Sequence, residues 1–116
     1  MQRIEPGERE AILKIVALIH QDPQQHYSIA ALAVAVGASL TRVKQLFKAV
    51  TGRPFYQQVF EIRMQRATEL LAATELPIPQ IARKVGYRNT NAFSRAFRKY
   101  TKGISASQYR LRYPGG

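Results

Sequence analysis

The chain contains no cysteine, and side chains suited to metal binding or catalysis are few. Without cysteine, its 116 residues can form neither a disulfide framework nor a thiolate metal site. The only histidines are His20 and His26 and the only aspartate is Asp22, so a zinc site or a catalytic triad lacks its usual members. The internal glycines stand singly at turns, which excludes a glycine-rich phosphate loop. We therefore predict that the protein is not an enzyme and holds no metal or cofactor.

Long hydrophobic runs are also missing. No apolar stretch approaches the roughly 20 residues that cross a bilayer, and the N-terminal sequence MQRIEPGERE has no apolar signal core. The absence of cysteine fits a reducing compartment. Together these features predict a cytoplasmic protein, which would be associated with the nucleoid if it binds DNA.

Acidic side chains are scarce and unevenly placed. The 7 acidic residues stand against 18 lysines and arginines, which gives a net charge of +11. No acidic residue lies between Pro23 and Phe60, and none follows Glu75. Positive charge segregated in this way favours a polyanionic partner, either nucleic acid or an anionic membrane surface. The hydrophobic content of 46% is sufficient for a folded core.

The two acid-free stretches contain one helical pattern twice. The pattern occurs in LTRVKQLFKAVTG at 40–52 and again in TNAFSRAFRKYTKG at 90–103, with apolar residues at i, i+3, i+4 and i+7. This spacing places the apolar residues on one face of a helix. They are Val43, Leu46, Phe47 and Val50 in the first copy and Phe93, Ala96, Phe97 and Tyr100 in the second. Both segments are predicted to be amphipathic helices with matching polar, basic faces.

A short helix precedes each amphipathic helix. It is predicted at 29–36, with Ser28 as N-cap and Gly37 at its end, and again at 78–85, ended by Gly86. A short helix, a glycine-containing turn and a second amphipathic helix form a helix-turn-helix. A single copy could be any helical hairpin, but two copies with matching acid-free faces favour contact with DNA.

These patterns predict an all-α fold of about seven helices. Two helix-turn-helix lobes are joined by one long central helix, predicted at 55–73. The predicted organisation is a lead-in at 1–7, a first lobe at 8–53, a linker helix at 54–75, a second lobe at 76–113 and a tail at 114–116. The long helix spans roughly 28 Å at 1.5 Å per residue. Because major grooves recur about every 34 Å on one face of DNA, helices 40–51 and 90–101 are predicted to enter successive major grooves.

Groove geometry selects the candidate DNA-binding residues. The N-terminal half of a recognition helix meets base edges, and positions further along meet phosphates. The base-reading candidates are Thr41, Arg42, Lys44 and Gln45 in the first copy and Asn91, Ser94 and Arg95 in the second, with Arg88 in the preceding turn. The phosphate candidates are Lys48, Arg98, Lys99 and Lys102. The alternative for each residue is a solvated surface side chain.

Other functions fit the sequence less well. A basic helical module that binds an anionic membrane surface or a protein partner is the main alternative, but it requires a free apolar face. The apolar stripes here match internal packing instead. Stacking of single-stranded bases on Phe47, Phe55, Phe93 and Phe97 is a further alternative, and their helical spacing favours the core.

The same residues resemble a known family. The segments IAALAVAVGASLTRVKQLFKAVTGRPFYQQVFEIRMQRATELL and LPIPQIARKVGYRNTNAFSRAFRKYTKGISASQYR resemble the DNA-binding domain of AraC/XylS transcription regulators. The resemblance extends from about Glu8 to Arg112. Its most specific parts are IARKVGY, FSRAFRKY and the later G-x-S with QYR. One departure is Ala106, where the family often has proline, and it is expected to loosen the entry to the last helix.

The resemblance implies a function and partners. It implies seven helices, sequence-specific promoter binding, activation more often than repression, and contact with RNA polymerase. The base-contacting positions that it implies are Thr41, Arg42, Lys44, Gln45, Arg88, Thr90, Asn91, Ser94 and Arg95. Most members carry a second domain that binds an effector or dimerises. We expect this chain to be the C-terminal part of a longer regulator, so that any effector acts through a domain absent from it.

Overall fold

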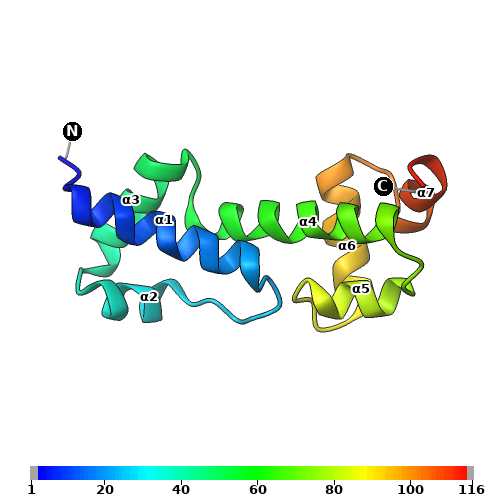
Figure 1. The fold of residues 1–116 in the computed structure, drawn as a ribbon, viewed down its shortest axis with the longest axis horizontal. Coiled ribbons are helices and arrows are strands. Elements are labelled where there is room, and N and C mark those ends of the chain that lie inside the picture. Colours follow the sequence, from blue (N-terminus) through cyan, green and yellow to red (C-terminus); the bar gives the residue numbers. More distant parts are fainter. Residues whose placement is uncertain (1–2, 115–116) are drawn as a thin grey trace. The chain divides into compact units, whose positions relative to one another are not determined.

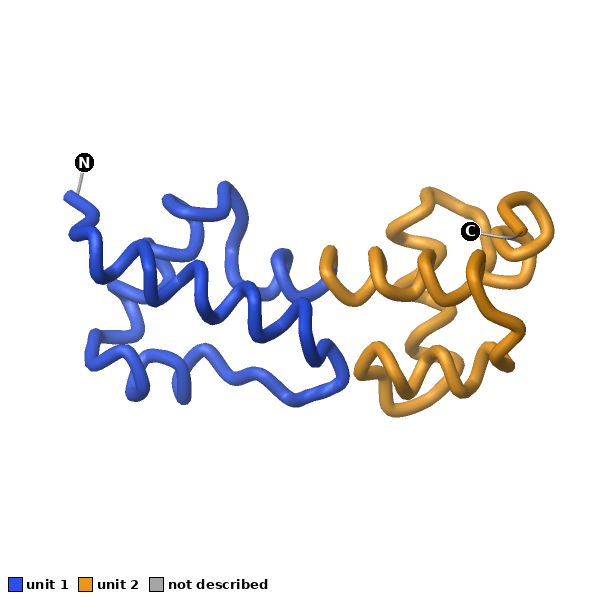
Figure 2. Tube along the Cα trace, in the orientation of Figure 1, with its two compact units in different colours: residues 1–60 blue, residues 61–116 orange. Residues whose placement is uncertain are grey.

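A computed structural model describes residues 3–114 of the chain, which form seven α-helices and, within this range, no β-strand. The helices are α1 (Pro6–Gln21), α2 (Ile29–Val36), α3 (Leu40–Thr51), α4 (Phe55–Ala73), α5 (Ile78–Lys84), α6 (Thr90–Thr101) and α7 (Ala106–Arg112) (Figure 1). The chain divides into two compact units, residues 1–60 and 61–116, and the division falls within α4 (Figure 2). The predicted all-α class is confirmed.

The core of unit 1 is formed where α1 and α2 pack on α3. Ile12 and Ile19 of α1 are completely buried, as is Phe47 of α3. The ring of Phe47 meets the ring of Phe55 edge to face, with centroids 5.1 Å apart, a favoured aromatic geometry. The apolar stripe of α3 is therefore used inside unit 1, as its helical spacing predicted.

Local capping explains where α2 and α3 begin. The side chain of Ser28 accepts a hydrogen bond from the Ala31 N–H, and that of Ser39 accepts one from the Arg42 N–H. Each bond satisfies a backbone donor that the first turn of a helix leaves unpaired. Between the two helices, Gly37 adopts the left-handed conformation at φ 76°, which glycine accepts without a steric penalty.

The start of α1 differs from the prediction. The predicted lead-in covers residues 1–7, but α1 begins at Pro6. Proline suits the first helical position because its missing N–H needs no partner there. Glu5 is the N-cap residue, and its N–H donates to the Glu8 carboxylate at 3.0 Å.

In unit 2, α5 and α7 pack on α6. The rings of Phe93 and Phe97 are completely buried, and Phe97 meets Tyr109 of α7 edge to face, with centroids 5.6 Å apart. Helix α5 ends at Lys84, one residue before the predicted end, and Val85 is its C-cap. These rings pack together in the core of unit 2, where the other buried side chains are aliphatic.

The entry to α7 is firmly capped although Ala106 replaces proline. The side chain of Ser105 accepts from the Gln108 N–H, and the Gln108 side chain accepts from the Ser105 N–H. This reciprocal capping box satisfies two donors at once. The expected loosening at Ala106, which is itself buried, is therefore wrong.

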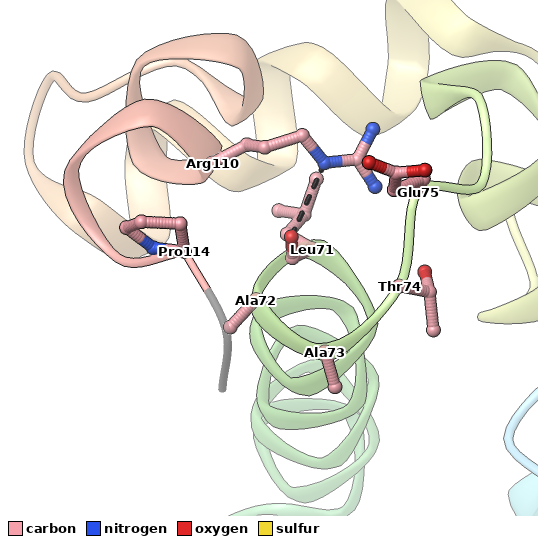
Figure 3. Close-up of a pocket in the computed structure, with 7 residues that line it drawn as sticks. All are labelled: Leu71, Ala72, Ala73, Thr74, Glu75, Arg110 and Pro114. Carbon is pink, nitrogen blue, oxygen red and sulfur yellow. Dashed lines mark hydrogen bonds between the residues drawn. The ribbon is translucent and has the colours of Figure 1, made fainter.

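Helix α7 is also tied to the end of α4 within unit 2. The Arg110 Nε–H donates to the Leu71 carbonyl at 3.1 Å (Figure 3), a carbonyl in the last turn of α4 where cations are favourable. A cavity of about 280 Å³ adjoins this contact, bordered by residues 71–75, Arg110 and Pro114. The cavity lies where α7 contacts the end of α4, and the residues around it belong to that contact.

The two units repeat one another in detail. At the end of α3 the Thr51 hydroxyl donates to the Phe47 carbonyl at 2.6 Å and accepts from the Arg53 N–H at 3.2 Å. At the end of α6 the Thr101 hydroxyl lies 3.0 Å from the Phe97 carbonyl and accepts from the Ile104 N–H, also at 3.0 Å. Phe47 and Phe97 are fifty residues apart, as are the two threonines. The offset of fifty residues between the two sequence patterns is therefore also the offset between equivalent structural positions.

Candidate nucleic-acid interface

Helix α3 exposes a polar, basic face opposite its buried stripe. Val43, Leu46 and Phe47 are at most 1% exposed, and their packing in unit 1 determines which side of the helix remains outside. The exposed side chains of this face are Thr41, Lys44, Gln45 and Lys48. None of them is acidic, so the face carries only neutral and positive groups and suits a polyanion.

Helix α6 exposes a similar face. Phe93 and Phe97 hold the opposite side in the core of unit 2. The exposed candidates are Arg88, Asn91, Arg95, Arg98, Lys99 and Lys102, whereas Thr90 and Ser94 are half-buried. Lys102 adopts the left-handed conformation at φ 61° where α6 ends. Within each unit, the structure thus places the predicted residues along one helix, mostly on its exposed side.

An aromatic cluster holds α6 in place. Tyr87, in the turn before α6, meets the Phe93 ring with centroids 5.8 Å apart, and the Phe93 and Phe97 centroids are 5.7 Å apart. The Arg63 guanidinium lies 5.7 Å from the centroid of the Tyr87 ring, a cation–π contact. Burial raises the pKa of the Tyr87 hydroxyl. The turn and the reading helix of unit 2 are therefore held by ring packing.

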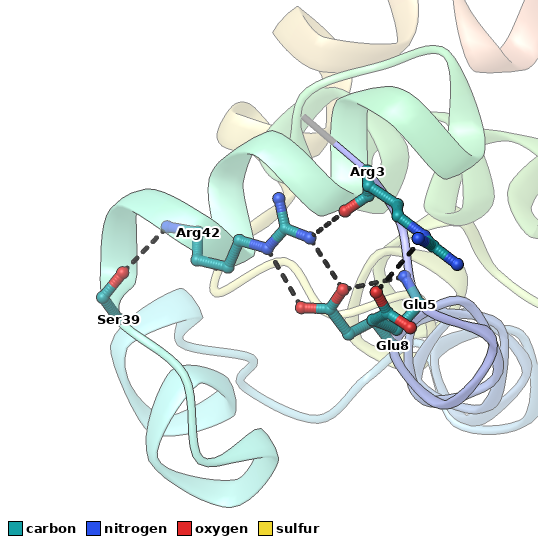
Figure 4. Close-up of polar contacts among 5 residues, drawn as sticks. All are labelled: Arg3, Glu5, Glu8, Ser39 and Arg42. Carbon is teal, nitrogen blue, oxygen red and sulfur yellow. Dashed lines mark hydrogen bonds and ion pairs between the residues drawn. The ribbon is translucent and has the colours of Figure 1, made fainter. Parts of the chain in front are cut away.

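Arg42 differs from the other candidates because its side chain is engaged within unit 1. Its Nε donates to Glu8 Oε2 at 3.0 Å and its Nη2 to Glu8 Oε1 at 2.7 Å. The same Nη2 donates to the Arg3 carbonyl at 2.6 Å (Figure 4). Only 22% of the Arg42 side chain and 26% of the Glu8 side chain are exposed. The guanidinium thus points at α1 rather than along the exposed face of α3.

The charge state of Glu8 follows from this pairing. The hydrogen bonds from Arg42, followed by that from the Glu5 N–H, lower the pKa of the Glu8 carboxyl from 4.5 to about 2. The same pair raises the pKa of the Arg42 guanidinium. Hydrogen bonds to a carboxylate favour its ionised form, so the pair is fully charged at neutral pH.

Sequence reasoning missed this contact. The sequence pattern placed Arg42 among the base-reading candidates, and the pair joins residues 34 positions apart, beyond any helical periodicity. One signal was available in the internal repeat. At the offset of fifty, Arg42 aligns with Ala92, whereas Thr41, Lys44 and Gln45 align with polar residues. Unlike those three positions, position 42 therefore carries a polar side chain in the first copy only.

A pocket lies beside the exposed face of α3. It has a volume of about 310 Å³ and is bordered by Ile29, Lys44, Lys48, Pro54, Phe55 and Tyr56. Two candidate DNA-binding lysines thus stand at the edge of an apolar hollow in unit 1. Among residues 3–114, no group of three or more histidine, aspartate or glutamate side chains gathers in a way that could hold a metal ion.

The described helices were also compared with the requirements of a membrane span. No single one of them combines the necessary length and apolar content. Taken together, α2 and α3 meet the requirement by length and composition alone, with a bend of 96° between them.

Comparisons with known proteins identify similar chains. Residues 32–112 match the family described as a helix-turn-helix domain. The lactose operon transcription activator of Staphylococcus xylosus is 35% identical over 101 residues, which cover 87% of this chain and 36% of that protein. This chain spans 28–42% of the length of that activator and of two further curated relatives.

Solved structures show the same fold. The C-terminal domain of AraT, a response regulator from Geobacillus stearothermophilus, is 33% identical with a TM-score of 0.80, and the match covers 97% of this chain and 90% of that one. An AraC-type DNA-binding domain-containing regulator from Chromobacterium violaceum is 26% identical with a TM-score of 0.79, over 94% of this chain and 96% of that one. The arrangement of helices described above therefore occurs in both.

Proposed function

The chain belongs to the AraC-type helix-turn-helix family, and on that premise we propose that it binds double-stranded promoter DNA by sequence and regulates transcription. The family resemblance inferred from the sequence is confirmed, and this family consists of transcription regulators rather than enzymes. The observation that carries the proposal is the pair of exposed, acid-free faces on α3 and α6. An acid-free face on a helix is the surface that enters a negatively charged groove.

The proposed mechanism assigns different roles along each helix. In the major groove, side chains of the first turns meet base edges, where Arg pairs with guanine and Asn or Gln with adenine. The proposed base-reading residues are Thr41, Lys44 and Gln45 of α3, and Arg88, Thr90, Asn91, Ser94 and Arg95 in or before α6. The proposed phosphate contacts are Lys48, Arg98, Lys99 and Lys102, because later turns lie nearer the backbone. Arg42 is not among them, because its guanidinium is bound to Glu8.

We further propose that α3 and α6 enter successive major grooves of one duplex. Helix α4 has 19 residues, a length of roughly 28 Å, which is close to the spacing of about 34 Å between major grooves on one face. A single chain would then occupy a long, asymmetric site. We expect the DNA to be bent at such a site, because bending would let a helix shorter than the groove spacing place α3 and α6 in both grooves.

The regulatory context is also proposed. A relative is named as a transcription activator, which supports activation as the regulatory effect. The proposed protein partner is RNA polymerase. The proposed location is the cytoplasm, at the nucleoid. Because the chain spans 28–42% of the length of these three relatives, any effector is proposed to act through a further domain of a longer protein. The basic surfaces of α3 and α6 are assigned to DNA rather than to that domain.

Selection of bound duplexes from a random pool tests the proposal directly. We expect enrichment of one site, binding that weakens steeply with salt because phosphate contacts release counterions, and protection of two adjacent major grooves in a footprint. Protection of a single half-site by one chain would refute insertion into two grooves and leave sequence-specific binding intact. No enrichment, together with binding to anionic vesicles, would favour the membrane alternative instead.

A matched pair of variants locates the interface. Lys44→Ala removes a positive charge from the exposed face of α3, and Lys14→Ala removes one from an exposed position on α1. We expect Lys44→Ala to weaken binding to the selected duplex and Lys14→Ala to leave it nearly unchanged. Equal effects of both changes would mean that net charge, rather than the α3 face, determines binding.

A further inference from the structure

The two units differ at the first turn of their amphipathic helices. In unit 2, the rings of Phe93 and Phe97 lie on the buried side of α6, and Tyr87 packs on Phe93. In unit 1, an ion pair joins the first turn of α3 to the first turn of α1 through Arg42 and Glu8. The structural equivalent of Arg42 in unit 2, at the offset of fifty, is Ala92. At this position unit 1 therefore carries a charged side chain where unit 2 carries alanine.

The hydrogen bonds of Arg42 leave it poorly suited to read a base. The Nε–Nη2 edge of the guanidinium is already used in a bidentate contact, since Nε and Nη2 each donate to one Glu8 oxygen, and Nη2 also donates to the Arg3 carbonyl. Charge-assisted, bidentate pairs of this kind are the strong ones among protein hydrogen bonds. If Arg42 turned toward DNA, the Glu8 carboxylate would remain without its cation, close to the incoming phosphates.

The contact is part of a larger network at two helix ends. Glu8 Oε1 also accepts from the Glu5 N–H at 3.0 Å, so the carboxylate that holds Arg42 also closes the first turn of α1. On the other side, the Arg42 N–H donates to the Ser39 hydroxyl at 3.1 Å, which closes the first turn of α3. The backbone and the side chain of Arg42 thus fix the start of α3 from two directions (Figure 4).

We propose that Arg42 is a positioning residue, which holds α3 against α1 through Glu8 so that Thr41, Lys44 and Gln45 present their side chains to DNA. This inference rests on the proposed function and changes the role of one residue within it. Thr41 precedes Arg42 and lies on the exposed face, so a rotation or shift at the start of α3 moves the reading side chains with it. Small displacements of this kind are sufficient to impair groups that must meet a partner in fixed geometry.

Removal of the Glu8 charge separates the two roles. If Arg42 positions α3, Glu8→Gln weakens binding, because the charged connection is lost although no DNA-facing residue changes. If Arg42 contacts DNA, Glu8→Gln releases its guanidinium and removes a nearby negative charge, so binding is unchanged or becomes tighter. The two roles therefore predict effects of opposite direction.

The experiment measures binding of the selected duplex, and of its single-base variants, by the wild type, Glu8→Gln, Arg42→Gln and the double variant. We expect each single change to weaken binding roughly tenfold, and the double change to be no weaker than either, as for residues that act through one contact. The loss should be spread over the base pairs read by unit 1. The control is Glu69→Gln, which breaks the exposed Arg66–Glu69 pair and should leave binding unchanged.

Two results would overturn the inference. Loss of discrimination at one base pair in Arg42→Gln, with wild-type binding by Glu8→Gln, would make Arg42 a base reader. Arg42 would be a phosphate contact if Arg42→Gln reduced the salt dependence of DNA binding by about one phosphate contact and Glu8→Gln bound DNA more tightly.

Hydrogen exchange controls for the folding of the variants. In Glu8→Gln we expect faster exchange of α3 amides with unchanged exchange of α6 amides, which shows that unit 2 is intact. Unchanged exchange in α3 would contradict the positioning role. Failure of the wild type to select any duplex would refute the proposed function and this inference together, whereas wild-type binding by Glu8→Gln refutes only the inference.

Discussion

Glu8 and Arg42 are 34 positions apart in the chain, and their Oε1 and Nη2 atoms lie 2.7 Å apart. Glu8 lies in the first turn of α1 and Arg42 in the first turn of α3, so one ion pair connects the start of α3 to the first helix of unit 1. The pKa of the Glu8 carboxyl, about 2, lies below its ordinary value of 4.5. The connection is therefore sensitive to strong acid.

The first prediction concerns this acid sensitivity. Because the folded-state pKa is lowered, the unfolded chain binds more protons between pH 4.5 and pH 2, and the stabilisation from Glu8 is complete above its unfolded pKa and lost as pH falls to about 2. We expect wild type to melt at a higher temperature than Glu8→Gln at pH 6, with the difference disappearing near pH 2. The measurement is a series of thermal melts, and a difference that persists at pH 2 would contradict it.

The second prediction concerns the aromatic core of unit 2. Phe97 is completely buried and contacts Phe93 and Tyr109. Phe97→Ala should lower the free energy of unfolding by about 3–5 kcal/mol, through lost burial and the cavity left behind. Urea denaturation measures this, and Tyr56→Ala is the control because the Tyr56 side chain is 68% exposed. A similar, small change in both variants would exclude the assigned role of Phe97.

The third prediction concerns base reading by α6. Arg95 is exposed in the second turn of the helix. If it reads a base, Arg95→Ala should reduce discrimination between the selected site and a single-base variant by about 1–3 kcal/mol. Competition binding with a panel of single-base variants provides the measurement. An equal loss on every duplex would assign Arg95 to a phosphate instead.

The fourth prediction compares two glycines with open space around them. A Cβ at Gly37 or at Gly7 meets no atom within 4 Å, so neither change causes a clash. Gly37 has φ +76°, where an L side chain costs about 1–2 kcal/mol, whereas Gly7 lies within α1. Gly37→Ala should therefore lower the melting temperature, and Gly7→Ala should leave it equal or raise it slightly. A loss of stability in Gly7→Ala with none in Gly37→Ala would reverse this interpretation.

The sequence alone predicted most of the local structure. The bounds of the helices at 29–36, 40–51, 55–73 and 90–101 agree with those of the structure, because helical periodicity and capping residues act over a few positions. Ser28 was correctly placed as a cap. Helix α1 begins at Pro6, inside the predicted lead-in at 1–7, because proline suits the first position of a helix although it disrupts the interior.

The sequence also predicts which residues face DNA, since the polar positions of α3 and α6 lie opposite their apolar stripes. It could not determine which polar side chain is already engaged within the protein. Only the tertiary structure brings Glu8 of α1 to Arg42 of α3, because that contact depends on how two helices pack and not on the spacing within either one. Helical periodicity selects a face of each helix, and the packing of α1 on α3 decides which members of that face remain available.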